Sequence, residues 1–77
     1  MTAATGAERA TRHLVEVEVD GRWLPASTGG WLVRRLLVFD DAAEGDWWAA
    51  MLNARRGLLA YRVRPTEETD DEIRRRR

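Results

Sequence analysis

Side chains suited to catalysis are scarce in this 77-residue chain. It contains no cysteine, a single histidine, His13, and a single serine, Ser27. A nucleophile needs a neighbouring base, and a phosphate-binding loop needs glycines followed by lysine, so the inventory supports neither chemistry. We expect His13 to be an ordinary solvated residue at the start of a strand. The sequence therefore predicts a protein that is not an enzyme.

Acidic side chains between residues 40 and 46 are the candidates for metal binding. Carboxylates are the ligands that hard divalent cations prefer. The run consists of Asp40, Asp41, Glu44 and Asp46. It lacks the spacing and the central glycine of an EF-hand loop, and the absence of cysteine excludes a zinc ribbon. We therefore expect a solvated acidic turn, with no metal and no cofactor.

Arginine and tryptophan are the residues best suited to binding another macromolecule. The chain has thirteen arginines, no lysine and four tryptophans. An exposed tryptophan beside an arginine is a frequent hot spot at protein interfaces, and a cationic strip with aromatic rings also suits a nucleic-acid backbone. If the segments around these residues form neighbouring strands, one partner-binding surface contains Trp31, Arg34, Arg62 and Arg64.

The distribution of charge favours a protein partner over nucleic acid. Thirteen acidic residues balance the arginines, and acidic blocks at residues 40–46 and 65–73 lie next to arginine-rich segments. Opposite blocks so close together can neutralise each other, and no helix-turn-helix or RNA-binding signature is present. A small sheet also leaves little volume for a cleft, so no small-molecule substrate is inferred. We expect a non-enzymatic protein–protein interaction module or a subunit of a larger assembly, self-association included. The alternative is a nucleic-acid-binding accessory protein that uses an Arg/Trp surface.

The chain divides into one domain and two charged ends. Residues 1–12 have no large apolar side chain after Met1 and are predicted to be a disordered arm, whereas residues 13–65 carry the pattern of a single globular domain. Residues 66–77 form a charged tail in which Thr69 and Glu72 have capping-box spacing, so a helix is expected if the tail docks. No segment has the length of a membrane span and no secretion signal is visible, so we expect a cytoplasmic protein without membrane contact.

A hairpin is the clearest local signal. Val15, Val17 and Val19 alternate with acidic residues, as in a half-buried strand. Asp20-Gly21 tolerates the positive φ angles of a type I′ turn, which predicts a returning strand over residues 22–26. The preferred register pairs Val19 with Arg22, Val17 with Leu24 and Glu18 with Trp23. Pro25 predicts that the second strand lies at an edge or ends early.

The remaining elements are two strands and a helix. Residues 31–39 are apolar on both faces and predict a central strand, with a short buried helix as the alternative. Residues 47–56 predict a helix that begins after N-cap Asp46, ends before Gly57 and buries the face listed next, with a strand over 47–53 as the alternative. That face contains Trp47, Trp48, Met51 and Leu52. A last strand is expected to end at Pro65.

The predicted fold is therefore α+β. It has a small, mostly antiparallel sheet in the order β-β-β-α-β, one packing helix and flexible termini. If residues 47–53 were a strand instead, the alternative would be an all-β, SH3-like small barrel.

Overall fold

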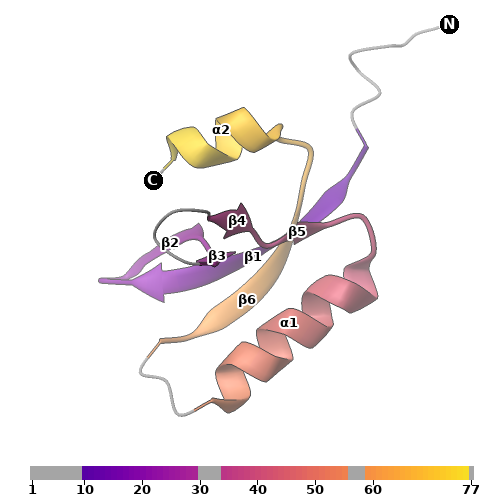
Figure 1. The fold of residues 1–77 in the computed structure, drawn as a ribbon. Helices are drawn as coiled ribbons and strands as arrows, with labels where there is room; N and C mark the ends of the chain where they lie inside the picture. Colours follow the sequence, from indigo (N-terminus) through magenta and orange to yellow (C-terminus); the bar gives the residue numbers. More distant parts are fainter. Residues whose placement is uncertain (1–9, 30–33, 56–58, 77) are drawn as a thin grey trace, which may run out of the picture.

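Short strands and two helices make up the part of the chain that is described by the computed structural model, which is residues 10–29, 34–55 and 59–76. Their arrangement is shown in Figure 1. The elements are β1 (Arg12–Val19), β2 (Arg22–Pro25), β3 (Ser27–Thr28), β4 (Arg35–Leu36), β5 (Val38–Phe39), α1 (Ala42–Ala54), β6 (Tyr61–Thr66) and α2 (Asp70–Arg75). The fold is the α+β class that the sequence predicts, and the sheet is not closed into a barrel.

Strand β1 is the centre of the sheet, and each of its partners runs antiparallel to it. β6 pairs along one side of β1, while β2 and β5 share the other side. Where β2 gives way to β5, Val15 donates to the carbonyl of Leu37, Ala26 donates to that of Val15, and Leu37 donates to that of Ala26. Beyond this corner the chain continues as the two-stranded β3–β4 ribbon.

The predicted hairpin is confirmed, including its register. Val19 pairs with Arg22 and Glu18 pairs with Trp23. Asp20 and Gly21 adopt φ angles of 52° and 78°, as the type I′ turn requires. β2 ends at Pro25 and pairs with β1 alone, which matches the expectation of a short edge strand.

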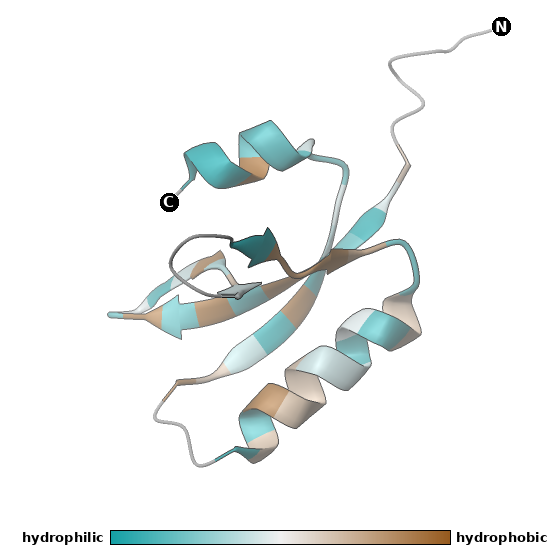
Figure 2. Ribbon diagram, viewed as in Figure 1, coloured by the Kyte–Doolittle hydropathy of each residue, from teal (hydrophilic) through white to brown (hydrophobic). Residues whose placement is uncertain are grey.

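The two helices cover opposite faces of the sheet (Figure 1). On the first face, α1 packs against a core that contains Val15, Ala26, Leu37 and Ala49. On the second face, fully buried Ile73 of α2 packs against Leu14 and Leu36. Figure 2 shows α2 as hydrophilic apart from one apolar band, so a single side chain supplies most of its apolar contact with the sheet.

The predicted helix exists, but it begins earlier than expected and turns a different face to the core. Asp41 is the N-cap, with its carboxylate accepting from the Ala43 N–H at 3.0 Å, so the predicted acidic loop is largely the first turn of α1. Alanines and a glutamate extend the helix, since they are good helix formers. The strand alternative is wrong. Gly57 lies outside the described residues, and α1 ends at Ala54 with Arg55 as C-cap.

Small residues explain which face of α1 is buried. Gly45 and Ala49 are buried, and Trp48 and Leu52 pack beside them, whereas Trp47 is 58% exposed. The expected packing face is therefore only partly right, because Trp48 and Leu52 lie on it and Trp47 does not. A Cβ at position 45 would lie 3.2 Å from Val63 Cγ1, so glycine lets the helix approach β6 closely.

The prediction of one central strand over residues 31–39 is also wrong in the part that the structure describes. Residues 31–33 lie outside the described residues, and residues 34–39 contain only the two-residue strands β4 and β5. Leu37 interrupts them because its backbone bonds to both Val15 and Ala26 at the corner. The central position belongs to β1 instead.

The segment predicted as a charged tail is packed against the sheet. β6 continues through Pro65 to Thr66, and the expected capping box begins α2. Thr69 Oγ1 accepts from the Glu72 N–H at 3.2 Å, and Glu72 Oε1 accepts from the Thr69 N–H at 2.7 Å. The expected docking-dependent helix is thus present. Neither described helix is long and apolar enough to cross a membrane.

The outer edge of β6 is capped at its beginning by a side chain of α1. Asn53 Nδ2 donates to the Tyr61 carbonyl at 3.0 Å, and the Tyr61 N–H donates to Asn53 Oδ1 at 2.9 Å. The amide of Asn53 therefore satisfies the two backbone groups that a neighbouring strand would otherwise bind.

Candidate functional site

A buried carboxylate lies at the centre of the sheet face that α2 covers. Glu16 of β1 is 1% exposed. Arg62 Nε donates to its Oε1 at 2.9 Å, and Arg64 Nε donates to its Oε2 at 3.2 Å. Arg76, which follows α2, places Nη2 3.5 Å from the same Oε2. Three cations from two elements therefore compensate a charge that would otherwise be costly to bury.

The pairing of β1 with β6 produces this arrangement. Glu16 lies directly opposite Arg62, and Leu14 lies opposite Arg64. Side chains two residues apart share a face of a strand, so both arginines lie beside the carboxylate. The alternation of valine and acid in the sequence predicts a solvated Glu16, but α2 and Arg76 cover this part of the face.

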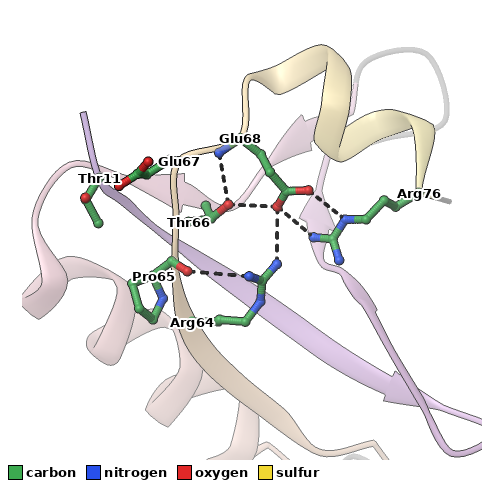
Figure 3. Close-up of a pocket in the computed structure, with 7 residues that line it drawn as sticks. All are labelled: Thr11, Arg64, Pro65, Thr66, Glu67, Glu68 and Arg76. Carbon is green, nitrogen blue, oxygen red and sulfur yellow. Dashed lines mark hydrogen bonds and ion pairs between the residues drawn. The ribbon is translucent and has the colours of Figure 1, made fainter. Parts of the chain in front are cut away.

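Glu68 is the second carboxylate of this group. Its Oε1 accepts from Thr66 Oγ1 at 2.7 Å and from Arg64 Nη2 at 3.2 Å. Arg76 Nε lies 3.2 Å from Oε2 but is poorly aligned, whereas Arg76 Nη2 donates to Oε1 at 3.3 Å. These contacts, most of which are drawn in Figure 3, surround an open groove of about 750 Å³. We call the set Glu16, Arg62, Arg64, Glu68 and Arg76 the Glu16 network.

The network changes the protonation equilibria of two members. The hydrogen bond from Thr66 is the main reason that the pKa of Glu68 lies below its ordinary value; burial opposes this effect, and Arg64 and Arg76 reinforce it. Burial lowers the pKa of Arg64, but the hydrogen bonds and charges of Glu16 and Glu68 outweigh it and raise the pKa. Both residues are thus held in their charged forms.

Each of the three guanidinium nitrogens of Arg64 already has a partner in the described part of the chain. Nε and Nη2 donate to Glu16 and Glu68, and Nη1 lies 3.5 Å from the Pro65 carbonyl. The sequence predicts a partner-binding role for Arg64. That role stays a prediction, and the contacts in the structure hold β6 to β1 and to the segment that leads into α2.

Arg62 presents its guanidinium differently. Only Nε is used by Glu16, and the guanidinium carbon lies 4.2 Å from the ring centroid of Trp23. The side chain is 44% exposed, and Nη1 and Nη2 make no hydrogen bond or ion pair with a residue that the structure describes. Two contacts therefore fix the group while two donor nitrogens remain available.

The four predicted surface residues fall into three situations. Arg62 and Arg64 are neighbours, as expected from their spacing. Arg34 is exposed and lines a separate groove of about 220 Å³ that also contains Leu59 and Tyr61. Trp31 lies outside the described residues.

Trp23 is the ring that contacts Arg62. The predicted register already placed Trp23 on the same face as Glu18.

Other chemistry-bearing residues gain no partners that suggest a site. His13 lies within β1 opposite Phe39 and Pro65. Asp41 caps α1, Glu44 and Asp46 lie within it, and Asp40 precedes the cap. Across residues 10–29, 34–55 and 59–76, no group of three or more histidines and carboxylates is arranged to hold a metal ion.

Comparisons of the chain with protein-family models, with curated proteins and with solved structures found no match.

Proposed function

We propose that this protein is a non-enzymatic interaction module that binds an acidic segment of another protein through Arg62 and Trp23. The observation that carries the proposal is the guanidinium of Arg62, which is stacked on Trp23 and anchored by buried Glu16, while Nη1 and Nη2 contact no described residue and the side chain is 44% exposed. A planar fork of this kind binds a carboxylate through two parallel hydrogen bonds.

Fixing the guanidinium in advance lowers the cost of binding. A free arginine loses rotamer entropy when a partner orders it, whereas Arg62 is already held at 2.9 Å by Glu16 and lies against an aromatic face. Trp23 is half-buried, so part of its ring remains accessible beside the fork. Tryptophan and arginine together are the side chains most enriched among interface hot spots.

The surrounding charges favour a short acidic peptide over a nucleic-acid backbone. Arg64 and Arg76 direct their donors to Glu16 and Glu68, so they do not extend Arg62 into a strip of available cations. A polyanion gains affinity from several phosphate contacts, whereas one carboxylate needs one fork. The nucleic-acid reading stays the alternative because the Arg62–Trp23 stack would also suit a phosphate next to an unpaired base.

The proposal is tested by quantitative capture from nuclease-treated lysate. The baits are the wild-type chain, Arg62→Gln, and the matched control Arg22→Gln, which changes an exposed arginine at the start of β2. We expect a set of proteins whose recovery falls at least about fivefold with Arg62→Gln and is unchanged with the control. Equal recovery by all three baits would show that Arg62 is not the contact.

A second measurement distinguishes the alternative. A labelled single-stranded oligonucleotide is titrated with the wild-type chain at increasing salt. Binding that weakens steeply with salt and disappears in Arg62→Gln would replace the peptide proposal with nucleic-acid binding. We expect no binding at low salt.

A further inference from the structure

A stripe of apolar side chains runs along the solvent side of α1. Trp47 is 58% exposed, and the alanines one turn before it and one and two turns after it are also exposed. The stripe consists of Ala43, Trp47, Ala50 and Ala54 and is called the Trp47 stripe below. Its spacing of four, three and four residues places it on one helix face, opposite the face that packs on the sheet.

Trp47 is held in place rather than loose on the surface. Its ring meets that of Trp48 edge to face, with centroids 5.4 Å apart and planes at 88°. Trp48 in turn stacks on Phe39 at the edge of the core, with ring centroids 6.3 Å apart. A large ring fixed in an exposed position among small residues forms a knob beside shallow depressions, and such exposed apolar surface marks an interaction site.

Charge is distributed along α1 with opposite signs at its two ends. Glu44 lies in the first turn, and Arg55 is the C-cap residue. Both are exposed, and neither makes an ion pair with a residue in the described part of the chain. They are eleven residues apart, about three helical turns, so they lie on the same flank of the Trp47 stripe.

We propose that a second copy of this chain packs antiparallel on the Trp47 stripe. The midpoint between Glu44 and Arg55 falls between Ala49 and Ala50, and a twofold axis there places each glutamate opposite the arginine of the other copy. The same axis places each Trp47 between Ala50 and Ala54 of the opposite helix. In an antiparallel helix pair like flanks meet, so one alignment satisfies both the apolar and the charged contacts.

A second copy of this chain is the proposed partner because α1 is complementary to itself when it is reversed. A helix from an unrelated protein would have to supply both a depression for Trp47 and an inverted charge pattern, whereas reversal of α1 supplies both. Alanines at the contact let two helices approach closely. Val63 packs on the core that α1 covers, and its neighbour Arg62 therefore points to the other face of β6. This dimer leaves the proposed acidic-peptide site open, so the two proposals fail independently.

Sedimentation velocity of the full chain tests the proposal over about 10 µM to about 1 mM. We expect the weight-average mass to rise from 8.8 kDa toward twice that value with concentration. Trp47→Ala should raise the dissociation constant at least about tenfold, and Arg22→Ala should leave it unchanged. A wild-type chain that stays monomeric at 1 mM, or a dimer that Trp47→Ala does not weaken, would overturn the proposal.

Charge exchange tests the antiparallel arrangement specifically. Glu44→Arg and Arg55→Glu each place like charges together in a homodimer, so each alone should dissociate more readily. Mixed in equal amounts, the two variants pair opposite charges at both contacts and should form a heterodimer, and the double variant should recover the wild-type constant. Circular dichroism confirms that each variant remains helical. If the mixture associates no better than its components, the arrangement is wrong.

Discussion

Removing the charge of Glu16 is the sharpest test of whether this buried carboxylate holds β1, β6 and the end of α2 together. Glu16→Gln keeps the size of the side chain and one acceptor oxygen but leaves the guanidinium groups of Arg62, Arg64 and Arg76 with Glu68 as their remaining carboxylate in the network. Breaking a fully buried ion pair typically costs about 3–5 kcal/mol, because the remaining charge stays unsolvated. Here the remaining charges are the arginines, whose side chains are 34–44% exposed and can be rehydrated.

The expected loss is therefore smaller than for a fully buried pair. Hydrogen bonds to charged groups contribute about 1.5–3 kcal/mol each, and part of this is recovered through water and the retained glutamine oxygen. We expect the free energy of unfolding to fall by about 1–3 kcal/mol. With a urea dependence near 1 kcal/mol/M for a chain of this size, the midpoint should move down by about 1–3 M.

Urea unfolding followed by tryptophan fluorescence measures the effect, with Glu18→Gln as the control. Glu18 lies two residues further along β1 on the same face, is half-buried, and makes no ion pair with a described residue. Its substitution should change stability by less than about 0.5 kcal/mol. If Glu16→Gln behaves like Glu18→Gln, the three arginines do not depend on the buried carboxylate and the reasoning fails.

Two further predictions concern α2 and its approach. Ile73→Ala removes the fully buried side chain that α2 contributes to the second core and should cost about 2–4 kcal/mol in urea unfolding; Arg74→Ala, at an exposed position, should cost less than about 0.5 kcal/mol, and equal effects would show that α2 is not anchored by packing. The pKa of Glu68 is lower in the folded chain than its ordinary value of 4.5, so its contribution to stability is present above that value and is lost as the pH falls through the folded pKa. Chemical unfolding between pH 7 and pH 3 should show a smaller loss of stability for Glu68→Gln than for the wild type, and parallel curves would refute the assignment.

Local chemistry made the hairpin predictable. Asp20-Gly21 determines the turn, the turn determines the register, and the register places Trp23 beside Glu18, so each step depends on residues close in sequence. The helix was predictable as an element for the same reason, although its N-cap is Asp41 and not the predicted Asp46. The helix therefore includes Gly45, which is buried where α1 approaches Val63 of β6, a contact between residues far apart in sequence.

The candidate site was only half predictable. The spacing of Arg62 and Arg64 indicates a common face, but nothing local shows that Glu16, more than forty residues earlier, lies beneath them. Its burial depends on a helix near the other end of the chain, and a pattern of alternating valine and acid reads the same whether or not that helix docks. Long-range pairing therefore determines that Arg62 uses only Nε within the described chain, whereas Arg64 uses all three of its guanidinium nitrogens.

The bonds between Asn53 and Tyr61 have a consequence for solubility. An extended chain joins a sheet by pairing with the exposed backbone donors and acceptors of an edge strand. A small protein with an unprotected edge strand can therefore aggregate edge to edge into fibres. At β6 the first pair of groups is already occupied by the amide of Asn53, and Pro65 near the other end has no N–H to offer. Few backbone groups on this edge of β6 are left to pair with a strand of another molecule, so edge-to-edge aggregation through β6 is disfavoured.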